Sequence, residues 1–310
     1  MKFSLPKADV YVPGGLDPAA ALTRTTHLCI AAHQDDVEIM AYHGIAECFG
    51  RDDRWFSGVV VTNGAGSPRT GPYAKIGDEE MQTVRRREQR RAARLGAYSI
   101  QIQLAHPSAA VKSPAHAGVR ADLVQILSAC RPEILYLHNP ADKHDTHVAV
   151  FLRCLEAIRS LPREQRPQKV LGCEVWRDLD WLPDSEKVAL DVSARPRLAQ
   201  KLLGVFRSQI AGGKRYNVAT LGRWAAHASY FVPQTTDATR ALTFAMDLTV
   251  LTKIESLDVR TYMCGLIRGF RDDVAARLQR LSYARPHDVS ARREDLTAGS
   301  CGSGFTEIRR

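Results

Sequence analysis

The sequence predicts an α/β protein: a Rossmann-like, mostly parallel sheet with helices on both faces, plus a C-terminal helical extension. Short apolar runs alternate with longer segments of helical periodicity through residues 26–235. The runs are apolar at almost every position, as expected of strands that are buried on both faces. Such regular alternation indicates parallel strands joined by crossover helices.

Each element follows from its local pattern. The expected strands are residues 28–32, 56–62, 100–104, 134–137, 170–176 and 188–192. Helices are expected at residues 38–49, 78–95, 119–130 and 147–158, then at 198–209 and 258–281. The helix at 78–95 begins with acidic residues and is followed by Gly96, which agrees with the rules for helix ends. Pro132 ends the helix at 119–130.

The composition changes along the chain and suggests four parts. Residues 1–25 are rich in Pro, Gly and Ala and read as an irregular N-terminal arm. The alternating region, residues 26–235, reads as the catalytic domain. Residues 236–282 read as a helical extension, and residues 283–310 as a polar tail.

Composition also limits the functional class. No apolar run is long enough to span a bilayer, and no signal peptide is evident, so we expect a cytoplasmic protein with no membrane partner. The seven cysteines are scattered and form no CxxC pair, which favours buried thiols. Much of the net charge of +9 lies in an arginine-rich helix at 85–94. That helix lacks interleaved aromatic residues, so we expect a solvated face and no nucleic-acid partner.

Two polar segments carry the chemistry. AHQDDVE (residues 32–38) follows the first strand, and KHDTH (residues 143–147) comes after the fourth. Sites in open parallel sheets form outside the carboxyl ends of the strands, where both segments are expected. Either segment alone also fits a simpler role, as a helix N-cap or a polar loop. Together they favour a metal site.

The expected ligands are His33, Asp36 and His147. His33 and Asp36 are three residues apart in a tight turn, and His147 lies on the apolar, inward stripe of its helix. Two imidazoles and one carboxylate suit one Zn²⁺ per chain with a fourth position left for water, although another divalent cation is an alternative. Zinc in such a site activates water for hydrolysis.

Two residues remain for proton transfer. Asp35 neighbours a ligand but points elsewhere, and we expect it to be the general base. His144 precedes His147 by one turn and is expected to bind the oxyanion and to protonate a leaving amine. Glu88 is expected to brace the site loop from the inward face of its helix, held by Arg85 or by backbone N–H groups of residues 63–66. Arg85 and Asn63 are candidate substrate contacts.

These residues resemble those of a known family. AHQDDVE resembles the AHPDDE signature of the PIG-L/LmbE zinc-dependent N-acetylglucosaminyl deacetylases, and HDTH (residues 144–147) resembles their HPDH. VVVTNGAG (residues 59–66) and the block at 85–96 are similar to the second conserved block of the family. ALDV (residues 189–192) and FRSQ (residues 206–209) are similar to its DIS and SQ region.

The resemblance implies a Rossmann-like deacetylase that uses the same ligands, base and acid. This sequence differs from the family in three places. Gln34 replaces a proline, Thr146 replaces an aspartate that orients the histidine acid, and residues 226–230 lack the usual acidic residue. Asp142 or Asp145 could take over the orientation of His144.

We therefore expect a zinc amidohydrolase acting on linear amides, which deacetylates an N-acetylglucosamine-type conjugate. One alternative is an amidase that cleaves another acyl group or a thiol-sugar conjugate. A second is a metal-bearing, non-catalytic binding module for an acidic partner. The sequence leaves open the aglycone, the pathway, the native metal, the role of the extension and tail, and whether the chain forms a homo-oligomer.

Overall fold

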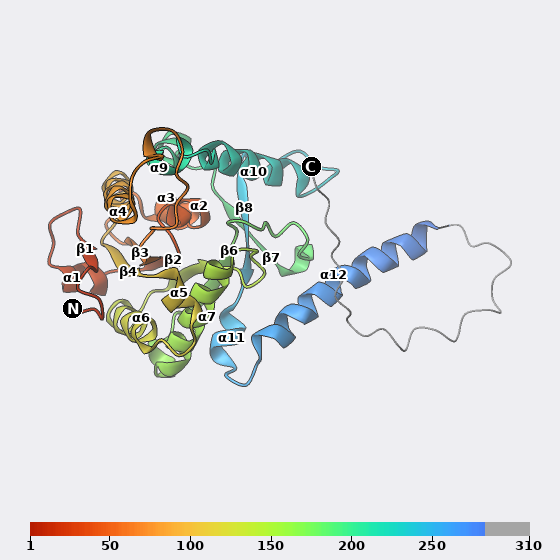
Figure 1. Cartoon of the computed structure of the whole chain (residues 1–310). Helices are drawn as coiled ribbons and strands as arrows, with labels where there is room; N and C mark the ends of the chain where they lie inside the picture. Colours follow the sequence, from red (N-terminus) through yellow and green to blue (C-terminus); the bar gives the residue numbers. More distant parts are fainter. Residues whose placement is uncertain (283–310) are drawn as a thin grey trace. The chain divides into compact units, whose positions relative to one another are not determined.

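The computed structural model describes residues 1–282, so the expected polar tail at 283–310 lies outside the described residues. The chain divides into two compact units, Met1–Phe270 and Arg271–Arg310. Everything that follows concerns the first unit, except the second half of the last helix. Figure 1 labels the helices and strands.

One eight-stranded sheet forms the centre of the first unit, with strand order β1-β4-β3-β2-β5-β6-β8-β7. The strands are β1 (Asp9–Tyr11), β2 (His27–Ala31), β3 (Phe56–Thr62), β4 (Gln101–His106), β5 (Ile134–His138), β6 (Lys169–Cys173), β7 (Lys187–Asp191) and β8 (Leu242–Asp247). The five strands from β4 to β6 in this order are parallel, and β1, β8 and β7 join antiparallel. The expected mostly parallel sheet is confirmed.

The order of the parallel strands determines where a site can form. β2 lies in the centre and pairs with β3 on one side and with β5 on the other. The chain leaves β2 toward β3 and β4, then crosses back to β5 and β6. The crossovers therefore diverge between β2 and β5, and the loops after these two strands border a crevice at the carboxyl end of the sheet.

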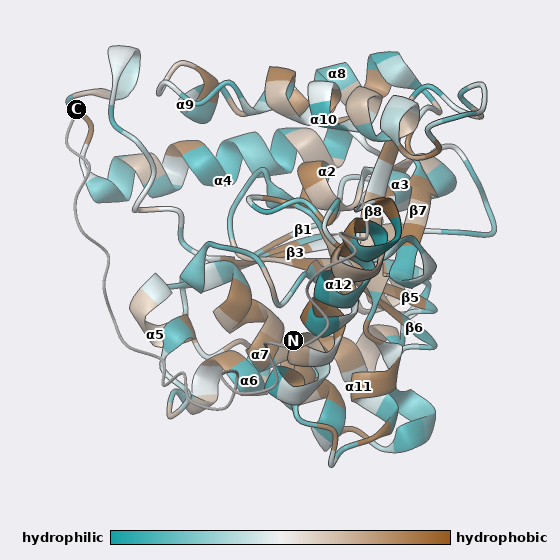
Figure 2. Cartoon of the chain, turned by 90° about the vertical axis from the view of Figure 1, so that its right-hand side faces the viewer, coloured by the Kyte–Doolittle hydropathy of each residue, from teal (hydrophilic) through white to brown (hydrophobic). Residues whose placement is uncertain are grey.

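Helices cover both faces of the sheet (Figures 1 and 2). One face packs mainly against α1 (Pro18–Thr23), α5 (Ser108–Lys112), α6 (Ala117–Cys130), α7 (Asp145–Ser160) and α11 (Thr249–Lys253). The other packs mainly against α2 (Asp36–Met40), α3 (Tyr42–Cys48), α4 (Asp78–Leu95) and α8 (Pro196–Leu203). The short α9 (Arg207–Ile210) and the longer α10 (Tyr216–Tyr230) lie on the side of α4 and α8, and α10 contributes Ala228 to one core and Trp224 to the other.

Strand β8 corrects the expectation of a purely helical extension after residue 236. β8 inserts between β6 and β7 and pairs with both. Its sequence, LTFAMD, is buried at every position but the last. A short apolar run of this kind does not distinguish a strand from a buried helix. Only pairing with β6, more than 65 residues earlier in the chain, decides that it is a strand.

The expected irregular arm at residues 1–25 is also partly ordered, because it contains β1 and α1. The arginine-rich helix α4 holds this arm in place. Arg90 forms an ion pair with Asp9 of β1, and its guanidinium lies 5.2 Å from the centre of the Tyr11 ring. The expected solvated face of α4 is therefore only partly free, since some of its arginines bind the N-terminal strand.

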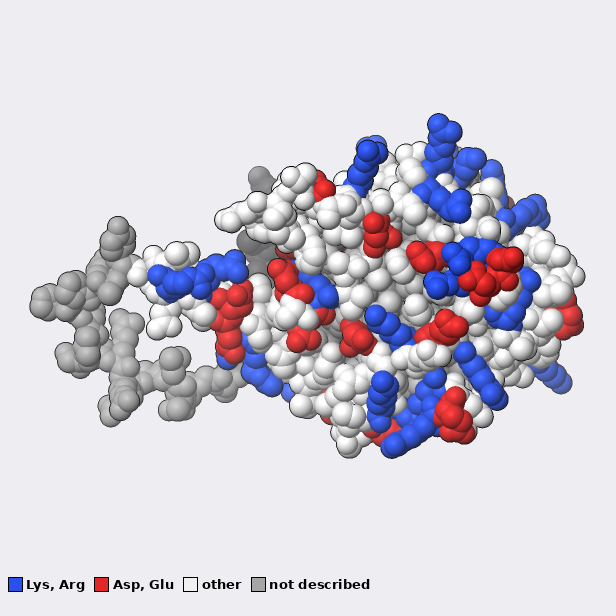
Figure 3. Space-filling view, turned by 180° about the vertical axis from the view of Figure 1, so that it is seen from behind, with Lys and Arg blue, Asp and Glu red and all other residues white. Residues whose placement is uncertain are grey.

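Two expected helices are each divided in the structure. The helix at 38–49 is two helices, α2 and α3, separated by Ala41, and the one at 198–209 is divided into α8 and α9 after Gly204. The last expected helix is α12 (Val259–Leu281). None of the described helices is long and apolar enough to cross a membrane. On the face shown in Figure 3, basic and acidic side chains are interspersed.

Candidate metal and catalytic site

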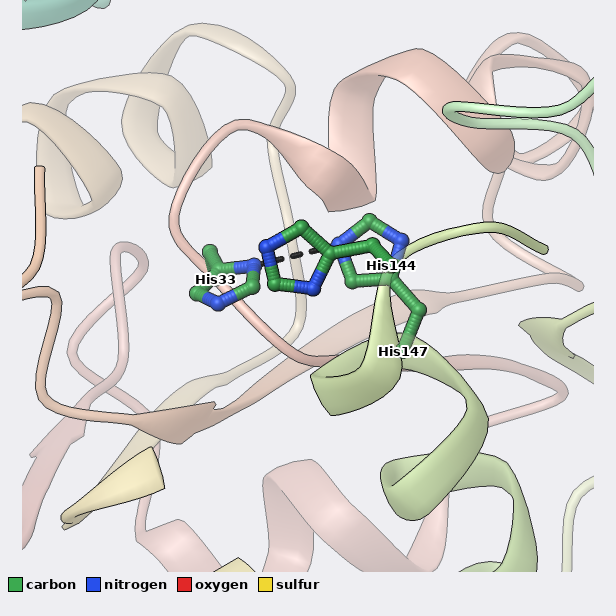
Figure 4. Close-up of side chains that lie close together, drawn as sticks. All are labelled: His33, His144 and His147. Atoms are coloured by element: carbon green, nitrogen blue, oxygen red, sulfur yellow. Dashed lines mark hydrogen bonds between the residues drawn. The ribbon is translucent and has the colours of Figure 1, made fainter. Parts of the chain in front are cut away.

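The two predicted segments meet at the crevice between β2 and β5. The loop after β2 carries His33 and leads into α2, and the loop after β5 leads into α7, which carries His147 in its first turn. Figure 4 shows the rings of His33, His144 and His147 gathered in one place. Residues more than 100 positions apart in the sequence thus share one site, as the sequence predicts.

The three predicted ligands form a nearly regular triangle. His33 Nδ1 lies 3.2 Å from Asp36 Oδ2 and 3.2 Å from His147 Nε2, and the third side, from His147 Nε2 to Asp36 Oδ2, is 3.3 Å. Bonds of about 2.0 Å in a tetrahedral arrangement separate neighbouring ligand atoms by about 3.3 Å. The donor set and its spacing therefore fit Zn²⁺, and the side chains need not move to bind it.

The charges around the triangle also favour a cation. Burial alone would lower the pKa of His147, but the carboxylates of Asp36 and Asp142 outweigh it and raise this pKa to about 9. Burial alone would raise the pKa of Asp36, but His147 and His33 hold it well below its ordinary value. The pocket thus attracts positive charge to the position between these side chains.

Asp142 fixes the orientation of His147. Its Oδ2 lies 3.3 Å from His147 Nδ1 and also accepts a hydrogen bond from the backbone N–H of Trp176, at 3.1 Å. Its Oδ1 accepts a hydrogen bond from the backbone N–H of His144. A carboxylate that holds the far nitrogen of a ligand histidine sets the ring orientation and its basicity. Asp142 therefore supports His147 rather than the ring of His144.

His138 is a residue of the site that the sequence identifies only weakly. It ends β5, is fully buried and stacks on the His147 ring, with the ring centres 4.0 Å apart. Its Nε2 is 3.6 Å from Asp36 Oδ2 but accepts a hydrogen bond from the backbone N–H of Ala32 at 2.9 Å. Since that bond uses the lone pair of Nε2, His138 braces the ligands from behind and is not itself well placed to ligate.

Asp35 lies beside the triangle in a strained conformation. It is the N-cap residue of α2 and has φ +89°, which is unfavourable for a residue other than glycine. Its Oδ1 lies 3.3 Å from Arg85 Nη2. Burial raises the pKa of Asp35 to about 7, although the positive charge of Arg85 opposes this rise. A carboxyl group with this pKa can both accept and return a proton near neutral pH.

The ring of His144 is oriented by the backbone rather than by a carboxylate. The N–H of Thr146 donates to His144 Nδ1 at 3.2 Å, so Nδ1 is the acceptor and Nε2 carries the proton. Burial and the neighbouring His147 lower the pKa of His144, which favours its neutral form. Asp145 is exposed in the first turn of α7, so it does not replace the missing aspartate.

Glu88 braces the site through a partner that the sequence does not reveal. Its two carboxylate oxygens accept hydrogen bonds from the backbone N–H and the hydroxyl of Ser208, at 2.7 Å and 2.5 Å. The Ser208 hydroxyl lies 3.4 Å from Arg85 Nη1. Arg85 also donates to the backbone carbonyl of Gln34, next to Asp35. The brace thus extends from α9 through α4 to the base.

The site opens into a cavity of about 530 Å³. Of the two candidate substrate contacts, Arg85 lines this cavity, but Asn63 does not. The Asn63 side chain instead accepts a hydrogen bond from the N–H of Ala65 and stabilises its own turn. The following residues Gly64 and Gly66 form the cavity wall in its place. A local turn thus takes up the amide oxygen of Asn63, and the expectation that Asn63 contacts the substrate stays a prediction.

Another part of the cavity wall comes from residues that sequence reasoning did not select. Trp176 follows β6, Gln209 lies in α9, Tyr216 begins α10, and Lys214 and Arg223 lie nearby. FRSQ (residues 206–209) is the one signal in the sequence that points to this wall. His227 of α10 does not line the cavity and stacks on Phe244 of β8, with ring centres 4.2 Å apart.

Comparison with known proteins finds a family model that matches part of this chain. Residues 28–158 match the PIG-L family, described as GlcNAc-PI de-N-acetylase. This segment contains every predicted ligand and catalytic residue, as well as Arg85, Glu88 and Asp142. No curated protein matches the chain in sequence.

Three solved structures share the fold. N,N'-diacetylchitobiose deacetylase of Pyrococcus horikoshii, in complex with its inhibitor, is 17% identical, with a TM-score of 0.58 over 76% of this chain and 88% of that one. The conserved protein TT1542 of Thermus thermophilus is 17% identical, with a TM-score of 0.54 over 76% and 98%. GalB, the 4-carboxy-2-hydroxymuconate hydratase of Pseudomonas putida, is 15% identical, with a TM-score of 0.53 over 72% and 96%. A deacetylase and a hydratase thus share this architecture, so the reaction must be argued from the site.

Proposed function

From the match of residues 28–158 to the PIG-L family, we propose that the protein is a zinc-dependent deacetylase. It hydrolyses the acetamide of an N-acetylated amino sugar of the N-acetylglucosamine type and releases acetate and a free amine. The observation that carries the proposal is the triangle of His33, Asp36 and His147, open to a cavity with Asp35 beside it.

We assign the metal to His33 Nδ1, Asp36 Oδ2 and His147 Nε2, with Asp142 and His138 behind them. A cation bound there supplies Lewis acidity, which polarises the acetamide carbonyl and makes water more acidic. The spacing of the three atoms supports zinc but does not exclude other divalent cations of tetrahedral preference.

Asp35 acts as the base that takes a proton from the attacking water. Its contact with Arg85 supports this role because it orients the carboxylate. Its pKa of about 7 also supports this role, because the group can then gain and lose a proton near neutral pH. Asp35 then returns the proton to the nitrogen of the leaving amine. One carboxyl group can serve both steps when its pKa lies near the working pH.

His144 donates a hydrogen bond from its Nε2–H to the developing oxyanion. The sequence suggested that His144 also protonates the amine. The bond from the Thr146 N–H to Nδ1 favours the neutral imidazole, since protonation at Nδ1 would break this bond. We therefore assign protonation of the amine to Asp35 and keep His144 as the oxyanion donor.

The cavity supports an amino sugar as the substrate. Its volume of about 530 Å³ lies in the range of small-molecule sites. The aromatic rings of Trp176 and Tyr216 in its wall, with centres 6.0 Å apart, offer apolar faces to a sugar ring.

The test is acetate release from a panel of N-acetylated amino sugars by the purified protein, with and without zinc. We expect acetate release that is abolished by chelation and restored by Zn²⁺. Parallel substrates with longer acyl groups or thiol-sugar amides identify the alternative amidase. Stoichiometric metal binding without hydrolysis of any amide would contradict the proposal and favour a binding module.

A further inference from the structure

The charged side chains that line the cavity fall into two groups. Among the residues lining it, the only carboxylates are Asp35 and Asp36, which belong to the candidate metal and catalytic site. The cations are Arg85 beside Asp35, and Lys214 and Arg223 next to Trp176 and Val175. A substrate bound in the cavity would therefore meet cations and no carboxylate in the part of the wall around Trp176.

Among the described residues, no carboxylate forms an ion pair with Lys214. Its side chain is exposed, and its ammonium lies 5.2 Å from the centre of the Trp176 ring. The Trp176 ring centre is in turn 6.1 Å from that of His144. The Trp176 ring is thus close both to His144 of the catalytic site and to the ammonium of Lys214.

Trp176 is held firmly in this position. Its backbone N–H donates to Asp142 Oδ2, the same oxygen that contacts His147. The aromatic platform and the metal ligand therefore share one brace. A ring stacked on Trp176 is positioned relative to the reacting carbonyl with little freedom, as an efficient site requires.

Two further side chains of this wall have hydrogen-bond donors that are not used within the described residues. Arg223 donates from Nη1 to the carbonyl of Val175 at 2.7 Å, which orients its guanidinium, and no carboxylate of the described residues forms an ion pair with it. Gln209 is only 4% exposed, yet its Nε2 has no hydrogen-bond partner in the described part of the chain. A buried donor without a partner is costly unless a ligand supplies an acceptor.

We propose that the substrate carries an anionic group, a phosphate or a carboxylate, on the side of the amino sugar away from the acetamide. Lys214 and Arg223 bind this group, Gln209 donates to an adjacent oxygen, and Trp176 supports the sugar ring. The inference rests on the proposed deacetylation and adds the substrate class to it. All four residues lie outside the segment 28–158 that matches the family.

The discriminating variant is Lys214→Met, which removes the ammonium, keeps most of the apolar stem and alters an exposed position that the fold does not need. Hydrogen bonds to charged groups are worth about 10- to 100-fold in an equilibrium. We expect kcat/KM for an anionic substrate to fall about tenfold or more, mainly through KM. The fall in kcat/KM for neutral N-acetylglucosamine should be several-fold smaller than the fall for the anionic substrate.

The substrates are N-acetylglucosamine 6-phosphate, N-acetylglucosaminuronic acid and neutral N-acetylglucosamine. The first two carry their anion at C6, across the ring from the acetamide at C2, and their comparison distinguishes phosphate from carboxylate. The matched control is Lys201→Met, an exposed lysine of α8 that does not line the cavity. Equal kcat/KM for neutral and anionic substrates in the wild-type protein would overturn the proposal and leave the deacetylase function intact.

If no substrate is hydrolysed, a binding measurement still tests the anion site independently of the deacetylase function. Titration calorimetry compares glucosamine 6-phosphate with glucosamine, on the wild-type protein and on Lys214→Met. Preference for the phosphate that is lost in the variant and weakens with salt supports the anion site even without turnover. Equal affinity for both ligands contradicts it.

Discussion

Replacing Asp142 with asparagine should weaken metal binding without removing a ligand. Asp142 accepts three hydrogen bonds: from the His144 and Trp176 backbone N–H groups and from His147 Nδ1. Burial alone would raise its pKa, but these donors, above all His147, hold the pKa below its ordinary value, so the group is a carboxylate in the fold. Asparagine has the same shape but only one acceptor oxygen.

The magnitude follows from this geometry. In the variant, the amide oxygen of the asparagine can accept from His147 Nδ1 and from the Trp176 N–H. Its NH₂ group then faces the N–H of His144, which loses its acceptor. Leaving one buried donor without a partner costs about 1–3 kcal/mol of stability. Loss of the carboxylate behind a ligand histidine lowers metal affinity about 10- to 100-fold. We expect both effects in Asp142→Asn.

The assay is competition for Zn²⁺ with a chromophoric chelator, together with denaturant unfolding of the metal-free protein. Asp122→Asn is the matched control, because Asp122 is also buried and contacts one histidine, His106, and two donors of Ser4, but it lies outside the cavity. The control should lose stability and keep its zinc affinity. Wild-type zinc affinity in Asp142→Asn, or an equal loss in Asp122→Asn, would refute the reasoning.

Three further changes test the remaining roles. Asp35→Ala should keep stoichiometric zinc but lower kcat by about 10²- to 10⁴-fold, because the ligands stay while the base is lost; wild-type turnover would remove the base assignment. His147→Ala should lose the metal, and one equivalent of zinc by elemental analysis would contradict its place in the triangle. Burial raises the pKa of Glu174 to about 7, so its contribution to stability is complete below about pH 4.5 and is lost as the pH rises through 7. The free energy of unfolding of Glu174→Gln, relative to wild type, should therefore rise by roughly 3 kcal/mol from pH 5 to pH 8 in denaturant titrations, and a flat difference would show that Glu174 is ionised in the fold.

Local patterns in the sequence were enough to find the strands of the parallel core and the metal triangle. The spacing of His33 and Asp36, three apart after an apolar run, and the place of His147 on an inward stripe are properties of neighbouring residues. Regular alternation of strands and helices then implied that both segments lie at one edge of the sheet. The structure confirms the fold class and brings the three side chains together.

Contacts between distant segments required the tertiary structure. Ser208 as the partner of Glu88, His138 behind His147, and the Trp176 wall all depend on elements that approach only after the chain crosses the sheet. Thr146 shows a different limit. Because threonine replaces the aspartate of the family, the sequence suggested that His144 lacks a partner. In the structure the backbone N–H of Thr146 donates to His144 Nδ1, and a pattern of side chains does not reveal such a bond.

The sequence by itself thus determined the candidate ligands and the layered architecture, because both depend on spacing within one element or one turn. Only the tertiary structure decided that β8 enters the sheet between β6 and β7, and that Lys214 and Arg223 line the same cavity as Asp35 and Asp36. Pairing and pocket walls join residues far apart in the chain, and the free energy that selects them comes from burial and hydrogen bonding in the assembled fold rather than from local preference.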